Sequence, residues 1–215
     1  MKFSFDPSYV PLLSRFMAKH DIRYYLNGIR VEPSEKGGVY LVATNGHIML
    51  VIRDATGTFE GDAKSYSSIR LTPWFISACK SRDVKSYVLR AHLDGKRLYI
   101  GPESGEHHHA LETFVQGGNP LIEGASFPDW RKLLPNFSGL ESGGFVGGGV
   151  ATSSLVPFHT SSKYSVIRLW RAAGATDGQA TYVQMVDMPE ALGIVMPTRG
   201  DYPHQFIKHM PGAGK

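Results

Sequence analysis

A repeated order of elements is the feature that most constrains how this chain folds. Asp6-Pro7 and Thr72-Pro73 each combine a residue suited to a helix N-cap with a proline suited to the first helical turn. After each pair, apolar residues recur at helical spacing, over 8–20 and 74–81, and runs typical of strands follow. The pattern predicts two copies of a β-α-β-β-β unit and therefore a fold built from repeats.

The strands expected in the first copy are 3–5, 25–31, 39–44 and 48–53, and those expected in the second are 65–71, 86–92, 97–100 and 110–115. A third, looser copy is expected from a strand at 145–151, a short helix opening at 152–154, and strands at 165–171, 179–185 and 192–196. Residues 55–63 are rich in Gly, Thr and Asp and are expected to form a connection. The predicted fold class is therefore α+β with antiparallel sheets.

The stretch 23–52 joins two alternating apolar runs through Gly37-Gly38 and ends on a corner at Asn45-Gly46. Gly-Gly between alternating runs predicts a β-hairpin.

Composition excludes several classes of protein. The chain has 215 residues, 42% of them hydrophobic, which is enough for a substantial core in one or two domains. Its single cysteine, Cys79, excludes a disulfide framework and favours a reducing compartment, so a cytoplasmic location is expected. No apolar run approaches the roughly 20 residues of a membrane span, and no membrane partner is expected. The net charge of +4 permits a polyanionic partner without requiring one.

A domain boundary is expected after the second copy. The segment 126–135 has two prolines, and 138–149 is rich in Gly and Ser. The predicted division is a two-repeat domain over 1–137, a one-repeat part over 138–200 and a C-terminal extension over 201–215.

Four motifs resemble the bacterial DNA polymerase III beta subunit, the beta sliding clamp. They are RYYLNG at 23–28, LVATNGH at 41–47, FPDWRKLLP at 127–135 and IVMPTR at 194–199, and they occur in clamp order. The match covers a region like the middle domain of the clamp, over 1–137, and then only the final half of its last domain. The chain thus resembles a shortened, phage-type version of that family.

The resemblance implies a DNA-clamp fold in which helices face a central hole and antiparallel sheets lie outside. Residues that would then lie near DNA are Arg15, Lys19, Arg23, Tyr24, Tyr25, Lys80, Arg82 and Lys163. Such cations would contact the phosphate backbone without reading sequence, and the tyrosines would stack on sugars or unpaired bases. On charge alone, the cations also fit ordinary solvated faces, and the tyrosines fit a pair of alternating strand residues.

The resemblance also implies a groove for short linear peptides of polymerases and repair proteins. The matching residues are Leu26, Thr44, Gly46, His47, Pro128, Lys132, Leu133, Ile194, Val195, Met196, Pro197, Thr198 and Arg199. The apolar members suit a pocket and the polar ones suit its rim, although Val195 and Met196 taken alone fit a core strand. The chain departs from the family at Asn45, usually aspartate, and at Ile48, often arginine.

Other kinds of site are disfavoured by the sequence. Three consecutive histidines, 107–109, point in different directions on a strand or turn, so no metal or other cofactor is expected. The glycine-rich run 143–154 lacks the lysine of a phosphate-binding loop. Asp129 and Glu123 do not form a pair suited to acid–base catalysis, and His47 as a general base is explained better by the corner.

The function expected is that of a non-catalytic processivity factor that encloses duplex DNA and tethers a polymerase bearing a clamp-binding peptide, with a clamp loader as a further partner. Rings of this family contain twelve repeats, so four chains with three repeats each would supply them, and a homo-oligomer is expected; a hidden fourth repeat would instead predict a trimer. The alternative is a non-ring adaptor or inhibitor that uses the same groove to compete for clamp partners.

Overall fold

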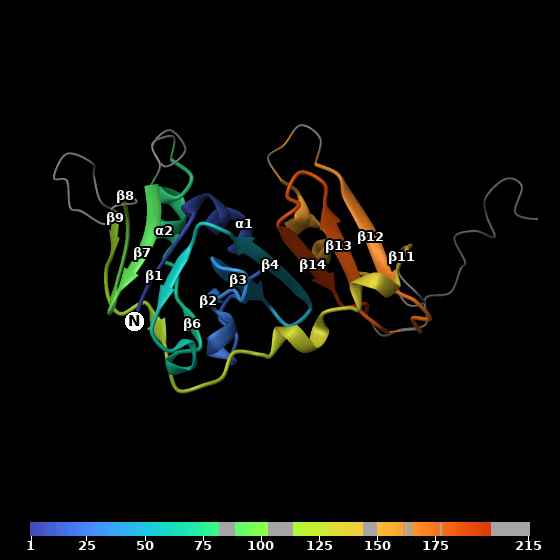
Figure 1. Cartoon of the computed structure of the whole chain (residues 1–215), viewed down its shortest axis with the longest axis horizontal. Helices are drawn as coiled ribbons and strands as arrows, with labels where there is room; N and C mark the ends of the chain where they lie inside the picture. The colour runs from blue at the N-terminus through green and yellow to red at the C-terminus, as the bar shows by residue number, and fades with distance from the viewer. Residues whose placement is uncertain are drawn as a thin grey trace, which may run out of the picture.

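The computed structural model describes residues 1–81, 89–102, 114–143, 150–160, 162, 165–176 and 178–198. These residues form mostly β-strands with a few short helices, and every strand pairing among them is antiparallel. Along the longest axis, strands β7–β9 lie at one end, β2–β4 in the middle and β11–β14 at the other end (Figure 1).

The order strand, helix, three strands occurs twice, as the sequence predicts, and we call these units the first and second repeats. The first repeat comprises β1 (Lys2–Phe5), α1 (Val10–Leu13), β2 (Arg30–Pro33), β3 (Val39–Thr44) and β4 (Ile48–Asp54). After β5 (Thr58–Glu60), the second comprises β6 (Ser68–Ile69), α2 (Pro73–Ala78), β7 (Leu89–Asp94), β8 (Arg97–Pro102) and β9 (Phe114–Gln116).

A linker then leads to the third repeat. The linker contains β10 (Leu121–Ile122) and the 3-10 turns η4 (Trp130–Leu133) and η5 (Phe137–Gly139), and it ends at β11 (Leu140–Ser142). The third repeat has the 3-10 turns η6 (Thr152–Ser154) and η7 (Val156–Phe158), followed by β12 (Ile167–Ala172), β13 (Thr181–Met185) and β14 (Ala191–Val195). Most of its expected first strand, 145–151, lies outside the described residues.

The strands form a five-stranded sheet, β5-β1-β7-β8-β9, a two-stranded sheet, β10-β6, and a seven-stranded sheet, β11-β12-β13-β14-β4-β3-β2. The first and second repeats interlock, because β1 pairs with β7 of the second repeat and Ile69 in β6 bridges to Ile29, just before β2. The first and third repeats join through their last strands, where β4 and β14 pair over five residues from Ile48↔Val195 to Ile52↔Ala191.

One face of the seven-stranded sheet packs against the helical segments. Leu41, Leu50 and Val195 belong to a core that includes Phe16, after α1, and Phe158, at the end of η7. The rings of Phe16 and Phe158 meet edge to face at 4.8 Å between centroids, so the first and third repeats share this core.

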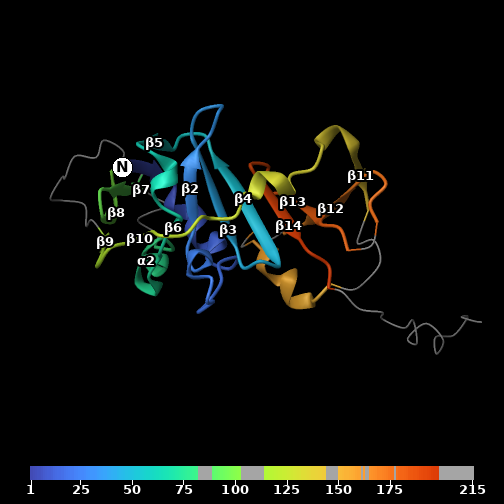
Figure 2. The ribbon, with the colours of Figure 1, turned by 90° about the horizontal axis from the view of Figure 1, so that it is seen from below.

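The other face of the same sheet carries a smaller core. Val42, Met49, Val51, Tyr182 and Ile194 pack there with Trp130 of the linker. Since side chains of a strand alternate between faces, Val42 points away from its neighbours Leu41 and Ala43. The linker crosses this face from the second repeat to the third (Figure 2).

Several predicted elements differ from those observed. The helix expected over 8–20 is reduced to a 3-10 turn, Pro7–Tyr9, and the single turn Val10–Leu13, since Pro11 offers no backbone donor and the chain turns away by His20, whose φ is 57°. The strand expected over 25–31 is a 3-10 turn at Tyr24–Leu26 followed by β2. The connection expected over 55–63 contains β5, which forms on the free edge of β1.

Candidate peptide groove and cation-lined groove

The corner between β3 and β4 is held by short side-chain hydrogen bonds. Asn45 Oδ1 accepts from the backbone N–H groups of His47 at 2.9 Å and Ile48 at 3.0 Å. Thr44 Oγ1 accepts from Gly46 N at 3.0 Å and donates to the carbonyl of Ile48 at 2.8 Å. Gly46 has a φ of 90°, which favours glycine. Asparagine supplies the acceptor oxygen that this turn requires, although it lacks the charge of an aspartate.

The end of β14 lies beside this corner. Met196 donates its backbone N–H to the carbonyl of His47 at 2.9 Å, which continues the β4–β14 ladder by one residue. The Met196 side chain is 36% exposed, and His47 is also exposed, whereas Val195 is fully buried. Two stretches nearly 150 residues apart in sequence therefore present side chains to one surface.

The linker is fixed to the sheet by a carboxylate on β2. Glu32 Oε1 accepts from Trp130 Nε1 at 2.8 Å and from the Arg131 guanidinium, while Oε2 accepts from Arg30 Nε at 3.3 Å. Arg30 is buried and also donates to the carbonyl of Ala63 at 2.6 Å. The linker segment that carries Pro128, Lys132 and Leu133 is thus positioned by Glu32.

Replacing Glu32 with alanine is expected to destabilise the protein by about 1–3 kcal/mol, because Trp130 Nε1 loses its acceptor and Arg30 loses its carboxylate partner in a largely buried place. The free energy of unfolding from urea titrations measures this. Glu141→Ala is the matched control, since its ion pair with Arg171 is exposed and is worth about 0.5 kcal/mol or less. Equal losses in the two variants would contradict the assigned role of Glu32.

The structure joins the predicted groove residues Met196 and His47 directly, and the predicted set as a whole contains both exposed and buried side chains. Gly46, His47, Pro128, Lys132, Leu133 and Met196 are exposed, and Pro197 and Thr198 are half-buried. Leu26, Thr44, Ile194 and Val195 are buried. Arg199 lies outside the described residues. Tyr182 Oη donates to the carbonyl of Leu133 at 3.3 Å and links the linker to β13.

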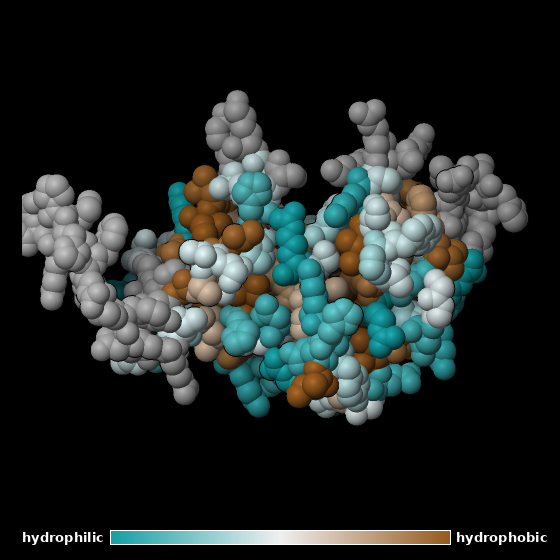
Figure 3. All heavy atoms as spheres, turned by 180° about the vertical axis from the view of Figure 1, so that it is seen from behind, coloured by the Kyte–Doolittle hydropathy of each residue, from teal (hydrophilic) through white to brown (hydrophobic). Residues whose placement is uncertain are grey.

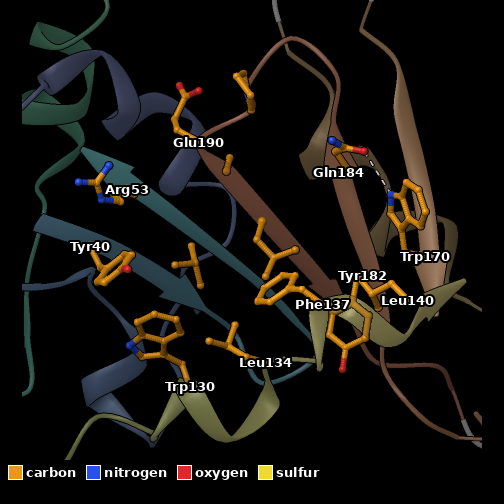
Figure 4. A pocket seen from close by; sticks show the side chains of 14 residues that line it. Tyr40, Arg53, Trp130, Leu134, Phe137, Leu140, Trp170, Tyr182, Gln184 and Glu190 are labelled. Carbon is orange, nitrogen blue, oxygen red and sulfur yellow. Dashed lines mark hydrogen bonds between the residues drawn. The ribbon is translucent and has the colours of Figure 1, made fainter. Parts of the chain in front are cut away.

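A cavity of about 500 Å³ lies on the same face, beside the predicted groove. Trp130, Leu134 and Phe137 of the linker face Tyr182 and Trp170 of β13 and β12 across it, and Arg53 and Glu190 lie at its far end (Figure 4). Trp170 Nε1 donates to Gln184 Oε1 at 3.2 Å. The size of the cavity and its aromatic lining with a few polar groups are typical of a ligand pocket.

None of the twelve predicted groove residues that the structure describes lines this cavity. Trp130 and Leu134 belong to the motif at 127–135, which was the available signal for them. No local sequence pattern marks the other lining residues Trp170, Tyr182 and Leu192 as part of a cavity. They reach it only because β12, β13 and β14 pair.

A second, larger groove of about 1020 Å³ lies between the helical segments of the three repeats. Among the described residues that line it, Arg15, Lys19 and Arg70 are cationic, His20 and His159 lie beside them, and none is acidic. Arg15 donates to the carbonyl of His159 and so joins the first repeat to the third. The sequence predicted Arg15 and Lys19 for a cationic surface but not Arg70, which falls within an expected strand.

The other residues predicted to lie near DNA occupy different places. Arg23 hydrogen-bonds to Asp21, lowers the pKa of that carboxyl to about 2, and lies against Gly46 at the corner. Tyr24 and Tyr25 lie in a 3-10 turn, with Tyr24 44% exposed. Lys80 is exposed outside the groove lining, while Arg82 and Lys163 lie outside the described residues.

Within the part of the chain that the structure describes, no three His, Cys, Asp or Glu side chains come together as metal ligands. The histidines at 107–109 lie outside that part. Burial raises the pKa of the Cys79 thiol to about 12, so this group is a neutral thiol near neutral pH. Among the same described residues, no helix has the length and apolarity needed to cross a membrane.

Comparison with solved structures shows that the fold is clamp-like. The DNA polymerase sliding clamp of Pseudomonas aeruginosa is similar with a TM-score of 0.58 and 18% identity, over 93% of this chain and 66% of that one. Also similar is the beta sliding clamp of Caulobacter crescentus, with a TM-score of 0.52 and 15% identity over 93% of this chain and 65% of that one. DNA polymerase III subunit beta of Borrelia burgdorferi has a TM-score of 0.53 and 12% identity over 94% of this chain and 65% of that one.

The chain thus spans about two thirds of the length of these clamps. No protein-family model and no curated protein matches its sequence. At such identities the likeness concerns the fold.

Proposed function

We propose that this protein is a non-catalytic, sliding-clamp-like processivity factor that assembles around duplex DNA and binds clamp-binding peptides of polymerases and repair proteins. The observation that carries the proposal is the convergence of β14, the β3–β4 corner and the linker. Met196 bonds to His47, and the linker packs through Trp130 in the same small core as Met49 and Ile194, which supports a surface shared by the three motifs. A clamp-like fold over 93% of the chain supports it.

The proposed peptide site is the exposed surface formed by His47, Met196, Pro128 and Leu133. An adaptable methionine beside a proline and a leucine suits an apolar anchor of a peptide, and His47 supplies a polar group at the edge. The predicted parts, 1–137, 138–200 and 201–215, remain our proposed division.

The double variant His47→Ala/Met196→Ala is expected to lower peptide affinity at least about tenfold, since a few exposed anchors carry most of the binding energy. The probe is a fluorescent peptide with the clamp-binding motif of a bacterial replicative polymerase, followed by fluorescence anisotropy. Val186→Ala, at a side chain that is 48% exposed and outside the site, is the control. Unchanged affinity of the double variant would refute this placement of the site.

The cation-lined groove is the proposed DNA-facing surface, with the helical segments toward the DNA and the sheets outside. Its charges are suited to phosphates, so binding is expected to be independent of sequence. A cytoplasmic location and a clamp loader as further partner follow from the same proposal.

The double variant Arg15→Ala/Lys19→Ala is expected to weaken duplex binding equally for different sequences and to reduce the slope of log K against log salt by about 2. Titrations of labelled duplexes at several salt concentrations measure both. Lys36→Ala/Lys96→Ala removes the same charge from exposed positions outside the groove. If this control pair had the same effect, only net charge would matter and the groove would not be the DNA surface.

A further inference from the structure

The described part of the chain shows how neighbouring repeats join by their last strands. The last strand of the first repeat, β4, pairs antiparallel with the last strand of the third, β14. Beside this pairing, aromatic rings of the two helical segments, Phe16 and Phe158, meet across the boundary. Gly193 on β14 leaves the room that the Phe158 ring occupies. Paired last strands flanked by aromatic rings therefore form one joint.

The second repeat also has a last strand beside an aromatic ring of its helix, and among the described residues this strand edge has no partner. Its last strand, β9, pairs with β8 on one side and forms the end of the five-stranded sheet on the other. Trp74 in the first turn of α2 is 53% exposed, and its ring lies 5.6 Å from that of Phe114 on β9. Val115 on β9 is 37% exposed. Because side chains of a strand alternate between faces, Trp74 and Phe114 lie on the helix side of β9 and Val115 lies on the opposite side. We call β9 with these three apolar residues the β9 edge.

The β9 edge is held rigidly. Gln116 Oε1 accepts from Thr72 N, at the N-cap of α2, at 2.9 Å, and Gln116 Nε2 donates to the carbonyl of Arg70 at 2.8 Å. The strand and the helix that carries Trp74 are thereby fixed to each other. A preformed apolar edge loses little conformational entropy on pairing.

The free edge at the other end of the molecule differs in chemistry. There, β11 carries Glu141, whose side chain is 49% exposed and paired with Arg171. Charged side chains on an edge strand disfavour pairing with another strand. A head-to-tail contact between β9 of one chain and β11 of another would pair an apolar edge with a charged one. A contact between the β9 strands of two chains would pair two apolar edges.

We infer that the β9 edge is an interface for a second copy of this chain, in which two β9 strands pair antiparallel about a two-fold axis and the Trp74 side chains of the two copies lie beside the pairing. The joint repeats the last-strand pairing of β4 with β14 between chains instead of within one. Such an isologous contact uses one self-complementary surface. Figure 3 shows that, on the face seen from behind, hydrophobic side chains gather in several places among hydrophilic ones.

This inference goes beyond the proposed function, which requires assembly without naming the surfaces that meet. It assigns one contact that joins chains in pairs. The proposed function additionally requires retention on DNA and binding of peptides, which are measured separately. A failure of either therefore leaves the β9 contact standing. Variants of unchanged mass would remove the β9 contact and leave an assembly through other surfaces, whereas a monomeric wild-type protein would remove both.

The test measures the mass of the full chain by light scattering during size-exclusion chromatography. Wild-type protein is expected at a multiple of two of the 23.7 kDa chain, and both Val115→Asp and Val115→Lys are expected at half the wild-type mass. Mixing the two variants is expected to restore the wild-type mass, because opposite charges then face each other across the two-fold axis. Only a contact of β9 with β9 gives this rescue.

Ile22→Asp is the control, since this side chain is 94% exposed and lies outside the edge, and it is expected to keep the wild-type mass. Thermal unfolding of all variants checks that they are folded, which is expected for substitutions at exposed positions. A monomeric wild-type protein, variants of unchanged mass, or a mixture that stays at the lower mass would each overturn the inference.

Discussion

Replacing Asp54 with alanine is expected to cost about 3–5 kcal/mol of the free energy of unfolding, because it leaves the charge of Arg90 buried without a partner. Both side chains are less than 10% exposed, and Arg90 Nη2 donates to Asp54 Oδ2 at 2.9 Å. The same carboxylate accepts from the backbone of Asp6 at 2.7 Å and of Thr56 at 3.0 Å. Asp54 therefore joins β4, the start of the first helical segment and β7.

Urea titration of Asp54→Ala, followed by circular dichroism, measures this loss. Asp129→Ala is the matched control, because its ion pair with Lys132 is exposed on both sides and contributes about 0.5 kcal/mol or less. The double variant Asp54→Ala/Arg90→Leu is expected to lose less than the sum of its single changes, since no buried charge remains. Comparable losses in Asp54→Ala and Asp129→Ala would show that the buried pair is not a main support of the fold.

Gly193→Ala is expected to destabilise the protein by about 3 kcal/mol or more, at the upper end of the cost of overfilling a packed core. A Cβ atom on Gly193 would lie 2.1 Å from Cε1 of Phe158, and Phe158 is itself held against Phe16. Either β14 or the Phe158 ring has to move. The change therefore acts on the joint between the first and third repeats.

Differential scanning calorimetry and urea titration of Gly193→Ala test this expectation. At Gly117 an added Cβ meets nothing within 4 Å, so Gly117→Ala is expected to change stability by about 0.5 kcal/mol or less. Combining Gly193→Ala with Phe158→Leu is expected to recover part of the loss, because a smaller side chain makes room. Additive losses would mean that the two residues do not compete for the same space.

Strands whose own sequence carries the signal were predicted well. β3 is found at the predicted residues, 39–44, and β4 ends one residue later than predicted, because alternation and the Gly-Gly and Asn-Gly turns are local features. The apolar residues of the expected first helix, such as Leu12, Leu13 and Phe16, are indeed buried. They reach the core through short turns instead of a continuous helix, since Pro11 and tertiary packing override the periodicity.

The candidate site was less predictable because tertiary pairing forms it. The contact of Met196 with His47 depends on β14 pairing with β4, and spacing alone does not encode that pairing. The resemblance to sliding clamps supplied it. The bond from Trp130 to Glu32 links residues 98 positions apart, and neither residue carries a local mark of that role.

The most direct test of the proposed function is topological retention on DNA. Assembled protein is incubated with nicked circular duplex, with a clamp loader and ATP, and the complex is separated from free protein by gel filtration at a salt concentration that screens simple electrostatic binding. The proposal predicts protein that stays on the circle and is released when a restriction enzyme linearises it. Equal retention on circular and linear DNA, or no retention on either alongside normal peptide binding, would contradict the encircling role and favour a non-ring adaptor that competes for clamp partners.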